Sequence, residues 1–222
     1  MRARWIAAVA LAAACHARLA TAQPSPGRIE LAVGAGWIGA IALDRVSADE
    51  AAFGGATRAL FNSDTQLDGS IGAALTLGVR LSSLVRAEAA MTYNPTHLTT
   101  RVTADREGVA DVAVDSRVTQ YIFGGDLIVQ PSRWQRHRLA PFASAGAGYL
   151  RQLSEGRVLV QNGAAYFAGG GLYYVRTPDR QRRMKATGLR LDVRALALRD
   201  GVAPDHKTRV APAVTASAFA RF

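Results

Sequence analysis

The chain has 222 residues, with 27 Lys or Arg against 17 Asp or Glu and a formal net charge of +10. This length suits one domain that buries a core or closes a barrel. A spanning helix needs about 20 consecutive apolar residues, and the longest apolar stretch, 5–14, has ten, which excludes a transmembrane helix. A basic balance is also typical of nucleic-acid binding, but the basic residues are spread singly along strand-like segments, which argues against it.

The N-terminus has the three parts of a secretory signal peptide in their usual order. Arg2 and Arg4 form the positive region, and residues 5–14 form the apolar region. Ala20-Thr21-Ala22 then gives a small-x-small cleavage site. We therefore expect residues 1–22 to be removed.

Cys15 follows three alanines, and this resembles a lipoprotein cleavage site at which the cysteine is lipidated. Cleavage there is the alternative to cleavage after Ala22. With cleavage after Ala22, residues 23–222 form a single domain without cysteine, and no disulfide arises. That domain keeps 24 basic and 17 acidic residues.

Apolar residues alternate with small or polar residues in a series of segments after Gln23, the period of a half-buried strand. Each segment has about the 9–11 residues that a tilted membrane strand needs. An even number of such strands is required of a single-chain bacterial barrel. We predict eight strands, over 28–38, 70–81, 84–93, 118–130, 139–150, 164–175, 187–198 and 210–222.

The connections alternate in length. They are short after the second, fourth and sixth predicted strands, and long near 39–69, 94–117, 151–163 and 199–209. Short periplasmic turns and long extracellular loops are typical of outer-membrane barrels, and this pattern puts both termini in the periplasm. Residues 99–114 still alternate weakly, so we interpret them as a hairpin that projects beyond the membrane. A ten-stranded barrel is the alternative.

The less apolar face of several strands carries charges of both signs. In a soluble sandwich these charges would face water, whereas a small barrel would enclose them, so that opposite charges pair while lipid covers the apolar face. The predicted charge network of the lumen consists of Arg80, Arg86, Glu88, Asp126, Arg190, Asp192 and Arg194.

Aromatic residues gather near the two ends of the predicted strands, where interfacial belts lie in membrane barrels. The predicted belts comprise Trp37, Tyr93, Tyr121, Phe142, Tyr149, Tyr173 and Phe222. The facing of the fifth and sixth strands is ambiguous. Phe142 and Tyr149 fall on opposite faces, so one of them points inward or a bulge lies between them.

The last strand ends on an aromatic residue, with apolar residues at alternate positions before it. These residues are Val214, Ala216, Ala218, Ala220 and Phe222. The pattern resembles the C-terminal strand signal of outer-membrane proteins, although Ala220 stands where a larger residue is usual. With the signal peptide and the alternating segments, the chain resembles the small eight-stranded outer-membrane barrel family typified by OmpA-like and OmpX-like domains.

This resemblance covers the whole of 23–222 and implies an all-β fold, a transmembrane up-and-down antiparallel β-barrel in the outer membrane of a Gram-negative cell. The implied partners are outer-membrane lipid, lipopolysaccharide and the barrel-assembly machinery, which would read the C-terminal strand. The implied state is a monomer. An eight-stranded barrel is just wide enough for side chains to fill it, so the resemblance implies a plugged lumen and a structural or surface-interaction role through the long loops.

We expect no catalysis, cofactor or metal, because the chain has no cysteine pair and no two histidines at ligand spacing. Two alternatives stay open. An outer-membrane enzyme that modifies lipid A or cleaves peptides would use His97 or Asp205-His206 as its base. A soluble lipocalin-like barrel is partly suggested by Gly36-Trp37 in the first strand.

Overall fold

The structure is a computed structural model that describes residues 27–51, 57–103, 112–154, 159–176, 184–202 and 207–222, with the backbone alone over 44–51 and 57–61. The signal peptide, Cys15 and Asp205-His206 lie outside the described residues. The signal cleavage, the lipidation alternative and the role of Asp205-His206 as a base therefore stay predictions. Within the described part of the chain, no helix is long and apolar enough to cross a membrane.

Over the residues that the structure describes, the fold is made of antiparallel strands with one short 3-10 helix, η1 (Ser132–Trp134). The strands are β1 (Ile29–Ile38), β2 (Ile41–Ala51), β3 (Thr57–Leu67), β4 (Ser70–Arg80), β5 (Val85–Thr103), β6 (Val112–Val129), β7 (Leu139–Ser154), β8 (Leu159–Arg176), β9 (Ala186–Asp200) and β10 (Thr208–Arg221).

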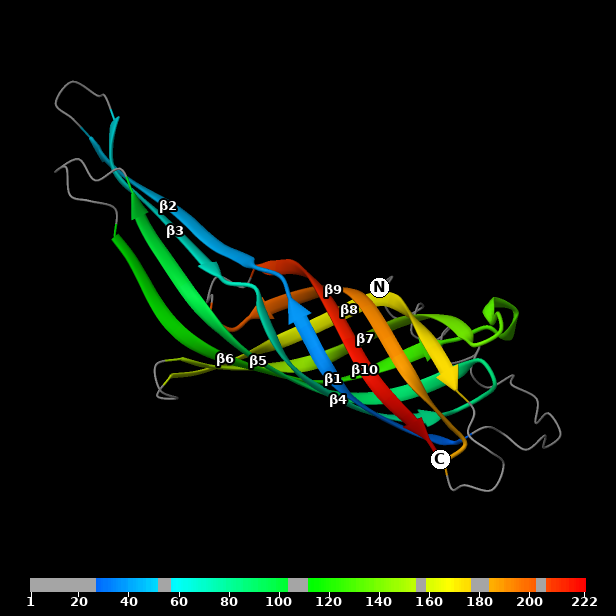
Figure 1. The fold of residues 1–222 in the computed structure, drawn as a ribbon. Coiled ribbons are helices and arrows are strands. Elements are labelled where there is room, and N and C mark those ends of the chain that lie inside the picture. The colour runs from blue at the N-terminus through cyan, green and yellow to red at the C-terminus, as the bar shows by residue number, and fades with distance from the viewer. Residues whose placement is uncertain (1–26, 52–56, 104–111, 155–158, 177–183, 203–206) are drawn as a thin grey trace, which may run out of the picture.

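Eight of these strands close into a ring in the order β1, β4, β5, β6, β7, β8, β9, β10, and β10 pairs back onto β1. The closing register pairs Trp37 with Val214 and Glu30 with Arg221. The predicted eight-stranded up-and-down barrel is therefore confirmed (Figure 1). Closure leaves no open sheet edge around the ring, which is what a strand-built membrane protein requires.

The connection 39–69, predicted as a loop, contains the hairpin β2–β3. This hairpin stays outside the ring, because β3 pairs with β5 only between Asn62 and Leu67, beyond the point where the pairing of β4 with β5 ends at Tyr93. The ten-stranded barrel is therefore wrong. The predicted projection of the third and fourth strands is correct, since β5 and β6 remain paired as far as Val102 and Val112.

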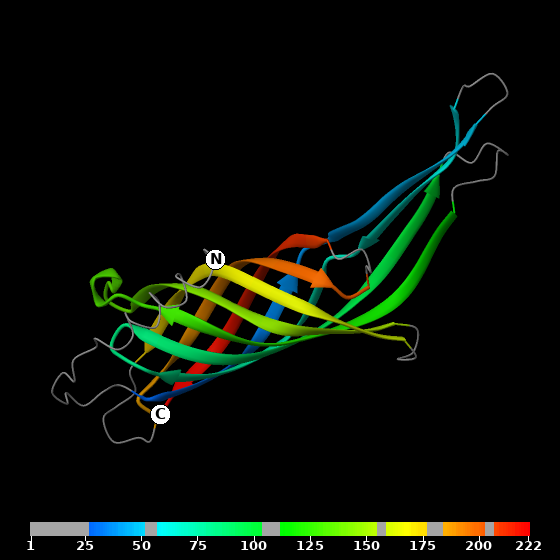
Figure 2. The same cartoon turned by 180° about the vertical axis from the view of Figure 1, so that it is seen from behind.

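The strands β2, β3 and the distal parts of β5 and β6 make a sheet that projects from one end of the ring, as Figures 1 and 2 show from opposite sides. Arg209 ties this extension to the ring. Its guanidinium donates to the carbonyl oxygen of Ala42 at 3.1 Å and also to that of Leu43. β1 begins and β10 ends at the opposite end of the barrel, which we call the terminal end.

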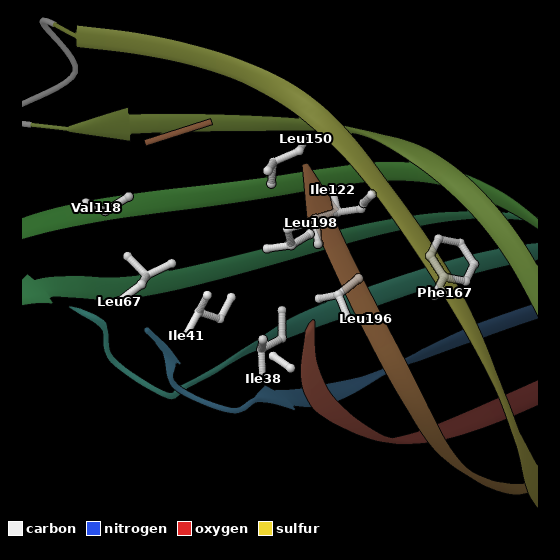
Figure 3. Close-up of a cluster of buried hydrophobic side chains, with 11 residues drawn as sticks. Ile38, Ile41, Leu67, Val118, Ile122, Leu150, Phe167, Leu196 and Leu198 are labelled. Carbon is white, nitrogen blue, oxygen red and sulfur yellow. The ribbon is translucent and has the colours of Figure 1, made fainter. Parts of the chain in front are cut away.

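A cluster of buried aliphatic side chains lies inside the barrel near the extension (Figure 3). Its members come from six strands of the ring and from the hairpin: Ile38, Ile41, Leu67, Val118, Ile122, Leu150, Ala165, Phe167, Leu196, Leu198 and Ala211. Because Ile41 and Leu67 belong to the hairpin, the cluster also fixes the hairpin against the ring.

Glycines on the inner face give the large interior rings their space. A Cβ added to Gly171 would lie 2.5 Å from Cζ of Phe142 and 2.1 Å from the carbonyl oxygen of Leu191. At Gly125 the nearest atom to an added Cβ is the carbonyl oxygen of Glu88, at 3.4 Å, which is an ordinary contact.

We predict that Gly171→Ala destabilises the folded barrel by about 1–3 kcal/mol, because the inserted methyl forces backbone or ring to move. Gly125→Ala is the matched control and should change stability little. The measurement is urea unfolding of the detergent-folded barrel, followed by heat-modifiable gel mobility. Equal midpoints for the two variants would contradict the packing described for β8.

Candidate functional site

The two faces of the barrel wall are reversed relative to a water-soluble protein. The aliphatic side chains of Leu75, Leu77, Leu189 and Leu191 are 47%, 51%, 62% and 48% exposed on the outside. On the same strand as two of them, Arg190 and Asp192 are only 2% and 3% exposed inside. A soluble lipocalin-like barrel would place these two sets the other way round, so that alternative is wrong.

Glu30 lies near the start of β1, toward the terminal end, and it is 2% exposed. Its Oε2 lies 2.7 Å from Nη1 of Arg86 and 2.6 Å from Nε of Arg221, which β5 and β10 bring from either side. Its Oε1 accepts a hydrogen bond of 3.0 Å from the hydroxyl of Tyr173. One carboxylate therefore joins three strands that are far apart in sequence.

The middle of the network is centred on Arg190 of β9. Its Nη1 lies 2.7 Å from Oε2 of Glu88, across the barrel on β5, and its Nε lies 2.7 Å from Oδ2 of Asp192 on its own strand. Asp192 also lies 3.1 Å from Nη2 of Arg194, and the same nitrogen lies 3.0 Å from Oδ2 of Asp126 on β6. These contacts make one continuous line of alternating charges.

The contacts above join six of the seven residues predicted for the network. The seventh, Arg80, is the cross-strand neighbour of Arg86. It lies half-buried at the end of β4 and donates to the carbonyl oxygens of Ser82 and Ser83 in the adjoining turn. Glu30 and Arg221 belong to the network and were not predicted. Their strand parity could have found them, because Glu30 shares a face with Ala32 and Gly34, and Arg221 shares one with Ser217.

Tyr173 is the aromatic centre of the network. Its ring centroid lies 4.8 Å from that of Phe142 and 5.1 Å from that of Phe219. The guanidinium carbons of Arg221 and Arg190 lie 4.8 and 5.3 Å from the same ring, in cation–π range. Guanidinium groups that stack on rings lose less by leaving water than isolated ones do.

The assignment of Phe142 and Tyr173 to an interfacial belt is therefore wrong. Both are buried inside the barrel, at 4% and 0% exposure. The reason is parity: Tyr149 takes the outer face of β7, so Phe142 takes the inner one, and the adjacent Tyr174 of β8 faces outward at 42%. Because Tyr173 and Tyr174 are adjacent, the sequence alone could not show which of the two faces lipid.

The other predicted belt residues face outward. Trp37, Tyr93 and Tyr149 are exposed toward the extension end, where the rings of Tyr93 and Tyr121 lie 5.3 Å apart. At the terminal end, the outward aromatic residues are Trp134, Tyr174 and Phe222. These two levels are where the rings of a membrane barrel meet the lipid headgroups.

The C-terminal strand β10 lies between β9 and β1. Its predicted signal residues Ala216, Ala218 and Phe222 are exposed on the outer face, and Val214 and Ala220 are half-buried there. The other face of β10 turns Phe219 and Arg221 into the lumen, where both are buried.

Beyond the charged network, toward the extension, the interior is mostly apolar. A cavity of about 70 Å³ lies between the network and the aliphatic cluster, and its walls include Thr92, Phe167, Arg194 and Thr215. A polar pair lies at the level of the cluster, where Nε2 of Gln152 donates to Oε1 of Gln120 at 2.9 Å.

His97, the candidate base of the enzyme alternative, lies on the outer face of the extension. Its Nδ1 is 3.0 Å from Oδ2 of Asp115, and about half of each side chain is exposed. Among the described residues, the pair therefore lies open at the surface of the extension. Within the described ranges, no group of three His, Cys, Asp or Glu side chains could hold a metal ion.

A closed ring with an apolar outside and a paired ionic inside defines a membrane-spanning β-barrel. No family model matches the chain, and no curated protein matches it, so the resemblance to OmpA-like and OmpX-like domains stays a prediction.

Solved structures similar to the chain include the outer membrane protein OprG from Pseudomonas aeruginosa. The two share 13% identity over 88% of this chain and 95% of that one, with a TM-score of 0.47. The outer membrane protein AlkL, solved in lipid bilayers, shares 14% identity over 92% of this chain and 95% of that one, with a TM-score of 0.42. Likeness at this level identifies no function.

Replacing Glu30 by Gln should lower the stability of the folded barrel by about 3–5 kcal/mol, since Arg86 and Arg221 then stay buried without their partner. Asp115→Asn is the control, because an exposed ion pair contributes at most about 1 kcal/mol. Thermal unfolding in detergent, followed by gel mobility, compares the two. A smaller loss for Glu30→Gln than for Asp115→Asn would show that the network does not stabilise the barrel.

The hydroxyl of Tyr173 can be tested apart from its ring. Tyr173→Phe keeps the aromatic packing and removes the hydrogen bonds to Arg86 and Glu30, so we expect a loss of about 1.5–3 kcal/mol. The same change at the exposed Tyr149 should have little effect. Urea unfolding of both variants is the measurement, and indistinguishable midpoints would argue against the hydroxyl's role.

Proposed function

We propose that this chain is a small outer-membrane barrel protein, non-catalytic and non-conducting, that acts through the extension at its outer end. The observation that carries the proposal is the reversal of the barrel wall. Rows of exposed aliphatic side chains cover the outside, and eight charged side chains pair inside. In water this arrangement would expose a large apolar surface, whereas in a bilayer each face meets the medium that it prefers.

The difference between the two ends supports one orientation in the membrane. The terminal end carries the turn from β4 to β5 and the turn that holds η1, and the other end carries the sheet extension. Short turns face the periplasm in outer-membrane barrels and long connections face outward. The signal peptide predicted for residues 1–22 supports export from the cytoplasm.

The interior contacts support the proposal of a closed lumen. The line of ion pairs crosses the barrel from Glu30 to Asp126, and the aliphatic cluster fills the section beyond it. An ion on this path would have to separate buried pairs, at a cost of several kcal/mol for each charge. The network would therefore plug the barrel and stabilise it, without forming a polar track.

The extension is the part of the molecule suited to contacts outside the cell. Its outer face carries exposed groups of both signs, among them Arg101, Asp115 and Arg117. Mixed charge at this position fits the anionic and sugar groups of lipopolysaccharide, or a protein ligand on another surface. We propose that binding there, with no cofactor, is the role of the protein.

Two measurements test this proposal. The full chain expressed in a Gram-negative host should fractionate with the outer membrane and show a faster gel mobility before heating than after. In planar bilayers the purified barrel should give no steady conductance. Recovery of the chain from the soluble periplasm would overturn the membrane assignment, and open-channel currents at moderate voltage would overturn the closed lumen.

A further inference from the structure

The terminal end carries a rim of exposed basic side chains. We name six of them the basic rim: Arg28, Arg133, Arg136, Arg138, Arg176 and Lys185. Among the described residues at this end, the acidic ones are Glu30, Glu88, Asp126 and Asp192, and all four are buried in the lumen network. Among the described residues, the exposed charged side chains of the terminal end are therefore all basic.

The other end of the barrel is different. There the exposed arginines Arg117, Arg151 and Arg199 accompany acidic residues such as Asp115 and Asp200, so that neither sign dominates. Inside the barrel, four carboxylates are matched by four guanidinium groups. Among the described residues, the excess of basic over acidic side chains is therefore largest at the basic rim.

The rim lies where the lipid-facing surface stops. Arg28 precedes the exposed Ile29, Arg138 precedes the exposed Leu139, and Arg176 follows the outward Tyr174 by two residues. Nη1 of Arg138 also donates to the hydroxyl of Tyr174 at 3.2 Å. A tyrosine of an interfacial belt marks the headgroup level, so this contact places the guanidinium at the depth of the lipid phosphates.

We infer that the basic rim binds the phosphate groups of anionic phospholipids in the leaflet at the terminal end. Arginine donates in pairs to phosphate oxygens, and its aliphatic stem can lie along apolar surface while its head reaches the phosphates. Each basic residue near an anionic membrane surface contributes about 1 kcal/mol. The bound phosphates would compensate the mutual repulsion of the rim. This inference rests on the membrane location proposed above.

The test measures lipid preference at the surface of the full chain, folded into phosphatidylcholine vesicles. Electron spin resonance compares spin-labelled phosphatidylglycerol with spin-labelled phosphatidylcholine. We expect the wild-type barrel to hold the anionic probe about fivefold more strongly, with the preference falling as salt is added. A triple variant, R133Q/R136Q/R138Q, should lose most of it. The matched control R151Q/R199Q/K207Q, which removes three exposed basic side chains at the other end, should keep it.

Several outcomes would overturn the inference: no preference in the wild type, a preference that survives in the rim variant, or its loss in the control variant alone. Competition by inorganic phosphate, beyond that of chloride at equal ionic strength, would assign the rim to free phosphate and also overturn it. If the rim variant does not fold, R28Q/R176Q/K185Q replaces it, with the same expected loss.

Gel mobility before and after heating is measured on every sample. A wild type that does not insert would overturn the proposed function and this inference together. A wild type that inserts without lipid preference would overturn only this inference.

Discussion

The pairing of carboxylates with guanidinium groups inside the barrel is the constraint on which the rest of the structure depends. An ion that leaves water without a partner costs several kcal/mol, so each of these side chains needs its counterpart at a fixed place across the lumen. Glu30 meets Arg86 and Arg221, and Arg190 meets Glu88, each within 2.7 Å. Once these contacts fix the inner face, the period of two turns the intervening aliphatic residues outward. A shift of one residue in any of these strands would put charges into lipid.

The same interior explains the distribution of small residues. Tyr173, Phe142 and Phe219 occupy the lumen beside the ion pairs, and the strands next to Phe142 and Phe219 have glycine at the paired positions. A Cβ at Gly188 would lie 2.9 Å from the ring of Phe219, and one at Gly78 would lie 2.9 Å from Cδ of Arg86. These large groups therefore fit into an eight-stranded barrel because the adjacent strand carries no side chain at these points.

The two ends of the barrel are built for different surroundings. At one end, β5 and β6 continue past the ring and carry β2 and β3 with them, and Arg209 holds this sheet to the barrel wall. Pairing between strands continues there without ring closure, so two sheet edges are left open. At the terminal end the described connections are the turn from β4 to β5 and the turn that holds η1, which carries Arg133, Arg136 and Arg138. We propose contacts outside the membrane for the first end and contacts with lipid phosphates for the second.

The alternating residues by themselves determined the eight strands of the ring, the asymmetry of their connections and most of the charged network, because a period of two is a local property of a strand. Local alternation could not show whether Phe142, Tyr173 and Tyr174 face inward or outward. In β7 and β8 small residues occupy both faces, so the two faces do not differ in polarity or size. Alternation also could not predict the pairing of Glu30 with Arg221, because these residues lie 191 positions apart in the chain and meet only when β10 pairs with β1. The formation of the hairpin β2–β3 likewise depends on contacts with residues far away in the chain. Its strands are held by the far end of β5 and by a buried cluster from six other strands, and no segment of 39–69 carries that information alone.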